Sequence, residues 1–78
     1  MLLQVTTFAN LRQFSGTKTG ELEDIEFREG STVRQLIAWM GIPETEVMLF
    51  IVNGRSVLID HELQDGDRVS LFPPIAGG

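Results

Sequence analysis

The stretch from residue 30 to residue 41 reads GSTVRQLIAWMG and carries the signals of a helix. Its apolar residues recur at the i, i+3, i+4, i+7 spacing that gives a helix one buried face, and they are Val33, Leu36, Ile37 and Met40. Thr32 stands before the first of them, and Gln35 three residues later completes the pattern of a capping box. Gly41 and the nearby Pro43 end the pattern, because a helix cannot continue through proline. We therefore expect one helix of about two to three turns here.

The residues before this helix show the period of two that is typical of strands. Residues 2–8 alternate, and one side of this strand is made up by Leu3, Val5 and Thr7. Residues 21–28 form a second candidate strand, in which Ile25 and Phe27 alternate with charged residues, and an antiparallel pair is the simplest arrangement. Leu22 is out of register with Ile25 and Phe27. Either a bulge interrupts this strand, or the strand begins after Leu22.

Three further strands are expected after the helix. Residues 47–52 are a continuous apolar run that ends at Asn53-Gly54, the strongest short signal for a hairpin. Val57-Leu58-Ile59 after that turn can form only a short strand. Asp65-Gly66-Asp67 predicts another turn, and residues 68–72 alternate as a last strand.

This order of two strands, one helix and three strands predicts an α+β fold. If the first and last strands pair in parallel, the helix can cover one face of a mixed sheet of four to five strands. That arrangement is the β-grasp. Because the chain has only 78 residues, we expect residues 1–72 to form a single domain and residues 73–78 to form a flexible C-terminal tail.

The composition excludes several classes of function. The chain has no cysteine, so it can form no disulfide, thiolate nucleophile or thiolate metal site. A formal net charge of -5 disfavours nucleic acid and anionic membrane surfaces as partners and favours a basic protein surface. The longest apolar run has six residues, and no basic leader precedes it. We expect a cytoplasmic protein that is monomeric when free.

Few residues are suited to catalysis or metal binding. The one histidine, His61, lies in a polar loop sequence and is assigned no role. The acids between residues 60 and 67 do not match the spacing of an EF-hand loop. A chain of 78 residues is also too small to enclose a deep active site. We therefore expect no metal site, no cofactor bound by this chain and no catalysis by the chain alone.

The sheet face opposite the helix is a candidate protein interface. If the residues that alternate with Phe72 face the helix, Phe72 points to the open face, where Phe8 has the same parity. Leu49 and Ile51 lie in a run that is apolar on both sides, so their parity stays open. Large apolar side chains on an uncovered face mark a partner surface. The alternative is that residues 10–20 cover part of this face. On the helix, we expect Trp39 to cover the edge of the core.

The end of the chain, Phe72-Pro73-Pro74-Ile75-Ala76-Gly77-Gly78, carries the strongest functional signal. Two prolines after a strand remove two donors and favour polyproline II geometry, so we expect the tail to project. Six residues at about 3.1 Å each reach roughly 19 Å, far enough to enter a partner's active site. Two terminal glycines can pass a narrow channel and leave the α-carboxylate open to attack. A carboxylate resists nucleophiles, so its use requires activation, which another protein would supply by making an acyl adenylate with ATP.

Four segments of the chain carry a family resemblance. They are Phe8-Ala9-Asn10-Leu11-Arg12, Val52-Asn53-Gly54-Arg55, Leu63-Gln64-Asp65-Gly66-Asp67-Arg68-Val69 and Pro73-Pro74-Ile75-Ala76-Gly77-Gly78. Together they resemble the small-subunit sulfur carriers of molybdopterin synthase, which are ubiquitin-like β-grasp proteins. The turn motifs are shared by many ubiquitin-like carriers, whereas the Pro-Pro-x-Ala-Gly-Gly ending is much more specific. Leu58-Ile59 is more apolar than is usual in the variable fourth-strand region of that family.

The resemblance implies a function that is centred on Gly78. A ubiquitin-activating-type adenylating enzyme would adenylate Gly78 with ATP, and a persulfide donor would convert it to a thiocarboxylate. The tail would then enter the large subunit of molybdopterin synthase, where Gly78 delivers sulfur to a cyclic pterin precursor. The residues expected to bind partners are Phe8, Phe72, Pro73, Pro74, Ile75, Ala76 and Gly77.

Three alternatives stay open on the sequence alone. Related carriers supply sulfur for thiamine, thiolated tRNA or cysteine synthesis. Other ubiquitin-like relatives are protein modifiers, which are joined to lysines through isopeptide bonds. A plain binding module that uses the open sheet face would need neither terminal glycine.

Overall fold

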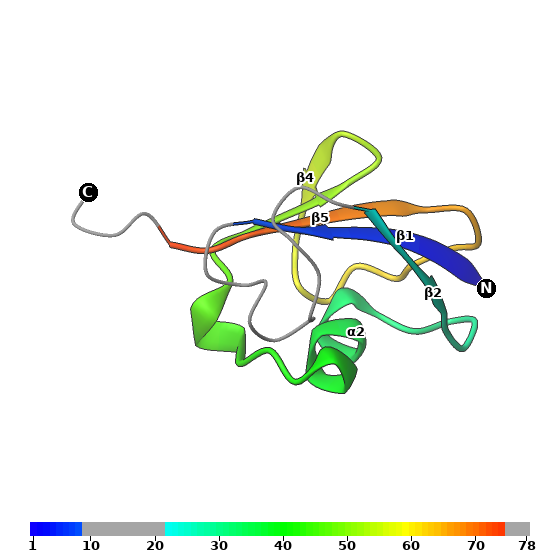
Figure 1. The fold of residues 1–78 in the computed structure, drawn as a ribbon, viewed down its shortest axis with the longest axis horizontal. Helices are drawn as coiled ribbons and strands as arrows, with labels where there is room; N and C mark the ends of the chain where they lie inside the picture. The colour runs from blue at the N-terminus through cyan, green and yellow to red at the C-terminus, as the bar shows by residue number, and fades with distance from the viewer. Residues whose placement is uncertain (9–21, 75–78) are drawn as a thin grey trace.

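The computed structural model describes residues 1–8 and 22–74, and its sheet has five strands with α2 lying along one side (Figure 1). The elements of the described chain are β1 (Leu2–Thr7), β2 (Leu22–Glu26), α2 (Val33–Met40), the 3-10 helix η2 (Glu44–Glu46), β3 (Leu49–Val52), β4 (Arg55–Val57) and β5 (Arg68–Phe72). The strand order is β2-β1-β5-β3-β4. β1 and β5 are parallel, and the other neighbouring strands are antiparallel. The predicted β-grasp fold is confirmed.

The helix begins and ends as the sequence predicts. The backbone N–H of Thr32 donates to Gln35 Oε1 at 2.8 Å, and the backbone N–H of Gln35 donates to Thr32 Oγ1 at 3.3 Å, which together form the capping box. Gly41 caps the other end in the left-handed conformation with a φ of 80°, which glycine adopts without steric cost. These local bonds fix where α2 starts and stops.

One apolar core joins α2 to the inner face of the sheet. Val33, Leu36 and Ile37 are the buried residues of the helix. The core cluster also contains Leu3, Val5, Ile25, Ile42, Val47, Val52, Leu63, Val69 and Leu71. The alternation predicted for the first and last strands is therefore confirmed, because their inward residues are buried against the helix.

The structure corrects the predicted start of β2. Neither a bulge nor a late start occurs, because β2 begins at Leu22 and pairs with β1 in an unbroken register from Thr6↔Leu22 to Leu2↔Glu26. The strand is also shorter than the predicted residues 21–28. Backbone pairing sets the limits of a strand, and it does not require every apolar side chain to share one face.

The structure also moves β4 toward the turn. The hairpin at Asn53-Gly54 is confirmed, with φ values of 52° and 81° that are typical of a type I′ turn. A two-residue turn of this type pairs Val52 directly with Arg55, so the strand runs from Arg55 to Val57 and not over the predicted residues 57–59. Leu58 therefore lies beyond the strand.

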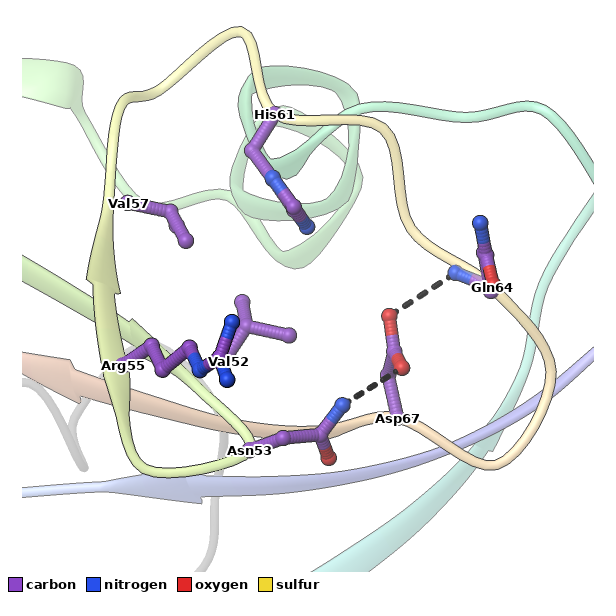
Figure 2. Close-up of a pocket in the computed structure, with 7 residues that line it drawn as sticks. All are labelled: Val52, Asn53, Arg55, Val57, His61, Gln64 and Asp67. Carbon is purple, nitrogen blue, oxygen red and sulfur yellow. Dashed lines mark hydrogen bonds between the residues drawn. The ribbon is translucent and has the colours of Figure 1, made fainter.

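A buried carboxylate ties this hairpin to the turn before β5. Asp67 is 9% exposed, and it accepts hydrogen bonds from Asn53 Nδ2 and from the backbone N–H of Gln64, each at 2.8 Å (Figure 2). Asn53 Oδ1 accepts in turn from the backbone N–H of Arg68 at 2.9 Å. Asn53 thus has two tasks, since it forms the turn and also links two loops.

We expect Asp67→Ala to lower the free energy of unfolding by about 2 kcal/mol, because it removes a buried carboxylate and leaves two part-buried donors without their acceptor. Urea denaturation monitored by circular dichroism measures this change. Asp24→Ala is the matched control, since Asp24 is an exposed acid on β2 and its loss should change stability by less than about 0.5 kcal/mol. Equal stability of the two variants would contradict a structural role for Asp67.

Candidate functional site

The last strand ends between two neighbours that hold its final residues in place. The backbone N–H of Phe8 donates to the carbonyl of Leu71 at 3.2 Å, and the backbone N–H of Met48 donates to the carbonyl of Phe72 at 2.9 Å. Pro73 and Pro74 follow, and neither has an N–H to continue the ladder. Strand pairing therefore stops at Phe72, and the chain leaves the sheet at a fixed point next to its centre.

Phe8 and Phe72 form a stacked aromatic pair at this point. Their ring centroids are 4.4 Å apart, and their planes differ by only 3°. Both side chains are half-buried. The prediction that they share the open face is confirmed, because Leu71 points into the core and Phe72 alternates with it.

The structure settles the parity of the run before the hairpin. Phe50 and Val52 pack in the core, whereas Leu49 lies opposite Phe72 in the antiparallel register and is 40% exposed. Ile51 follows Leu49 on the same face by alternation. We call Phe8, Leu49, Ile51 and Phe72 the open-face patch. The suggestion that residues 10–20 cover this face lies outside the described residues.

The far end of the same face is polar. Arg68 Nη2 donates to Gln4 Oε1 at 3.5 Å, and Gln4 lies opposite Asp24 on β2. Ser70 separates Arg68 from Phe72 along β5. The open face thus changes from polar at the hairpin end to apolar where the tail begins. An interface of this kind has an apolar part that is buried and a polar part that fixes the orientation of the two proteins.

The tail itself is described only at its start. Pro73 is half-buried and Pro74 is exposed, while Ile75, Ala76, Gly77 and Gly78 lie outside the described residues. Their predicted roles stay predictions. The described part shows that the tail leaves beside the open-face patch, so a protein that holds the tail also meets this patch.

Two other residues singled out in the sequence lie away from the tail. Trp39 is 63% exposed and contacts Phe27 in a tilted geometry at 5.7 Å, so it covers the rim of the core as predicted. His61 is exposed and lines a shallow pocket with Arg55 and Asp67 (Figure 2). The carboxylate of Asp67 accepts hydrogen bonds from Asn53 and from the backbone of Gln64, and no serine, threonine, cysteine or lysine lines this pocket.

The sequence pattern missed Met48. This side chain belongs to the apolar run, yet it is 67% exposed, because it precedes β3 and lies at the edge of the sheet. Its backbone is one of the two contacts that hold the end of β5. An apolar residue just before a strand gives no periodic signal, so the sequence could not place it.

Residues 1–8 and 22–74 contain no group of three or more histidine, cysteine, aspartate or glutamate side chains that could hold a metal ion. None of the helices in this part of the chain is long and apolar enough to cross a membrane.

Comparison with known proteins gives consistent matches over nearly the whole chain. Residues 5–78 match the ThiS family. The molybdopterin synthase sulfur carrier subunit of Escherichia coli (strain K12) is 35% identical over an alignment of 82 positions, which covers 99% of this chain and 100% of that protein. The structure of a putative molybdopterin converting factor, subunit 1, from Pyrococcus furiosus is 36% identical with a TM-score of 0.73, covering 96% of this chain and 99% of that one.

A third match concerns the fold. A protein-protein complex of subunit 1 and 2 of molybdopterin-converting factor from Helicobacter pylori 26695 contains a chain that is 24% identical. Its TM-score with this chain is 0.62, and the match covers 100% of both chains.

Proposed function

This chain belongs to the ThiS family, and we propose that it is a sulfur carrier that acts as the small subunit of a molybdopterin synthase. One observation carries the proposal: the last strand stops at Phe72 beside a partly exposed apolar patch, and Pro73 and Pro74 lie outside the sheet ladder. A carrier needs this arrangement, because its reactive end must enter the active sites of other proteins while the domain provides the grip.

The proposed chemistry takes place on the carboxylate of Gly78. A carboxylate oxygen attacks the α-phosphate of ATP, and pyrophosphate leaves, which gives an acyl adenylate. The terminal sulfur of a persulfide then attacks the acyl carbon and displaces AMP, which gives an acyl disulfide. A thiol attacks the donor's sulfur in that acyl disulfide, forms a disulfide with the donor and releases the thiocarboxylate. A thiocarboxylate is a better nucleophile than a carboxylate, so its sulfur can attack an electrophilic carbon of the pterin precursor, and water then cleaves the acyl–sulfur bond and returns the carboxylate.

The residues of this chain position that group and perform no acid or base catalysis. We propose that Pro73 and Pro74 stiffen the start of the tail, which reduces the entropy lost when a partner takes it up. Ile75, Ala76 and Gly77 are proposed to line a narrow channel in the partner. The open-face patch would hold the domain against the mouth of that channel.

Because this chain supplies only the reactive end and a binding surface, its partners must supply the catalytic groups. The Escherichia coli relative is named a subunit of a synthase, so we propose that the large subunit of that synthase receives the tail of this chain. ATP and the persulfide donor are proposed to be bound by a ubiquitin-activating-type adenylating enzyme and its sulfur source, and not by this chain.

Sulfur transfer tests the proposal. The chain is loaded with labelled sulfur and incubated with the large subunit of a molybdopterin synthase and the cyclic pterin precursor. We expect the label to move to the pterin product and the chain to return to its carboxylate mass. The thiazole precursor of thiamine, tRNA and a cysteine precursor are the comparison acceptors. Transfer to one of them and not to the pterin would contradict the proposed acceptor.

A further inference from the structure

A groove at the edge of the sheet is not used by the site described above. β4 pairs with β3 only from Phe50 to Val52, so no described strand flanks the outer side of Leu49. The resulting groove has a volume of about 560 Å³, runs along residues 56–59 and reaches η2. Its apolar lining includes Val47, Met48, Leu49, Phe50, Leu58 and Ile59.

The apolar side chains at the rim of this groove are unusually exposed. Leu58 is 82% exposed, and Met48 is 67% exposed. Phe50 and Ile59 form part of the floor, where they pack against the core. A single exposed leucine needs no explanation, but a concave surface with two exposed apolar rims and an apolar floor is typical of a binding site.

Arg34 holds the two walls of the groove in place. Its Nε lies 2.8 Å from Glu44 Oε1 on η2, and its Nη1 lies 2.7 Å from Asp60 Oδ1 beyond the other wall. The backbone N–H of the same residue donates to the carbonyl of Ile59 at 2.9 Å. These contacts connect both walls of the groove to α2, and the backbone hydrogen bond is the firmest of them because the two ion pairs are solvent-exposed.

The groove is continuous with the point where the tail leaves. Leu49 belongs both to its lining and to the open-face patch. Met48, on the rim, donates its backbone N–H to Phe72, the last residue before the prolines. A protein that holds the tail at Phe72 is therefore adjacent to this groove.

The charge around the groove indicates the chemistry of its occupant. Between residues 44 and 62 the chain has four acids and one arginine. Arg34 pairs with two of these acids, Glu44 and Asp60, so acidic groups still outnumber basic ones around the groove. Glu46 is half-buried and belongs to η2 together with Glu44, and Glu62 is exposed beyond Asp60. Such a rim favours an apolar side chain that is flanked by lysine or arginine.

We propose that this groove is a second docking site for the large subunit of the synthase, which inserts an aliphatic side chain flanked by basic residues. The proposal rests on the proposed function. A stable interface involves about 20 to 30 residues on each side, and the tail with the four side chains of the open-face patch falls short of that number. The groove supplies the missing area on the side of the patch where β4 stops.

Two substitutions test the groove without disturbing the core. Leu58→Arg and Met48→Arg each remove an apolar rim contact and repel a basic partner. We expect each to weaken binding of the unloaded chain to the purified large subunit about tenfold or more, as measured by calorimetry. Trp39→Arg is the matched control, since Trp39 is similarly exposed but lies on α2. The affinity of this variant for the large subunit should stay within about twofold of that of the unchanged chain. Urea midpoints check that all three variants fold.

The outcomes separate the groove from the sulfur chemistry. The proposed docking site would be contradicted if both groove variants bind the large subunit within about twofold of the unchanged chain. It would also be contradicted if Trp39→Arg loses as much affinity as the groove variants. A dimer of this chain that Leu58→Arg dissociates would also overturn it, because the occupant would then be a second copy. If the groove variants lose affinity but the unchanged chain acquires no sulfur, the docking proposal stands and the carrier function fails.

Discussion

A chain that lacks Gly77 and Gly78 is expected to acquire no sulfur, whereas its fold should be unchanged. The truncated chain would end at Ala76, so its carboxylate would fall about 6 to 7 Å short of the position that a fully extended tail reaches. The strand ladder already ends at Phe72, so the free energy of unfolding should change by less than about 0.5 kcal/mol. Intact mass after incubation with the adenylating enzyme, ATP and a persulfide donor measures loading, and urea denaturation measures stability.

Gly78→Ala is the length-matched companion to this truncation. It keeps the carboxylate in place but adds a Cβ beside the reacting carbon, so we expect loading to slow by about tenfold or more without being abolished. A truncated chain that still acquires sulfur would show that the terminal glycines are dispensable. That result would favour a plain binding module that uses the open sheet face.

Phe72→Ala is expected to weaken binding to the large subunit by about a hundredfold, which corresponds to roughly 2.7 kcal/mol. Phe72 is the aromatic anchor nearest the tail, and aromatic residues at the centre of an interface dominate its affinity. Phe8→Ala removes the other ring of the stacked pair and should have a smaller effect of the same sign. Loss of either ring should lower the free energy of unfolding by about 1 to 2 kcal/mol, because both are only half-buried.

Leu2→Ala is the matched control for the aromatic pair. Leu2 lies in β1, the strand that leads to Phe8, and its side chain is 47% exposed. It has the same parity as Phe8 and therefore faces the same side of the sheet. It lies at the opposite end of β1 from the tail, so its removal should leave affinity within about twofold of the unchanged chain. Equal affinities of Phe72→Ala and Leu2→Ala for the large subunit would contradict the placement of the interface at the tail end of the sheet.

The sequence predicted best those features that are fixed by neighbours along the chain. The capping box of Thr32 and Gln35 and the glycine cap at Gly41 depend on residues within one or two turns. The hairpin at Asn53-Gly54 likewise depends on two residues whose conformations suit a type I′ turn. Each of these predictions is confirmed.

Strand limits were less predictable, because they depend on partners far away in the sequence. β2 starts at Leu22 because Thr6 of β1 pairs with it, and no period within residues 21–28 contains that information. The predicted strand at residues 57–59 relied on β-branched and apolar composition, but the turn pairs Val52 with Arg55 and places the strand earlier. Leu58 is released to the surface as a result.

In the candidate site, too, the features set by local sequence were predicted, and those set by strand pairing were not. Alternation along β5 placed Phe72 on the open face, and the structure adds that its ring stacks on Phe8. The parity of Leu49 could not be read from an apolar run and required the register with β5. The groove at Met48 and Leu58 arises where β4 stops short of the start of β3, which only the assembled sheet reveals.

The central claim is that Gly78 carries transferable sulfur, and the intact mass of the unchanged chain tests it most directly. The chain is incubated with a ubiquitin-activating-type adenylating enzyme, ATP and a persulfide donor, and is then measured without proteolysis. We predict a gain equal to the replacement of one oxygen by sulfur, located on the C-terminal residue by fragmentation. An unchanged mass in a system that loads a known carrier, or an isopeptide bond between Gly78 and a lysine of a target protein in place of that gain, would contradict the claim.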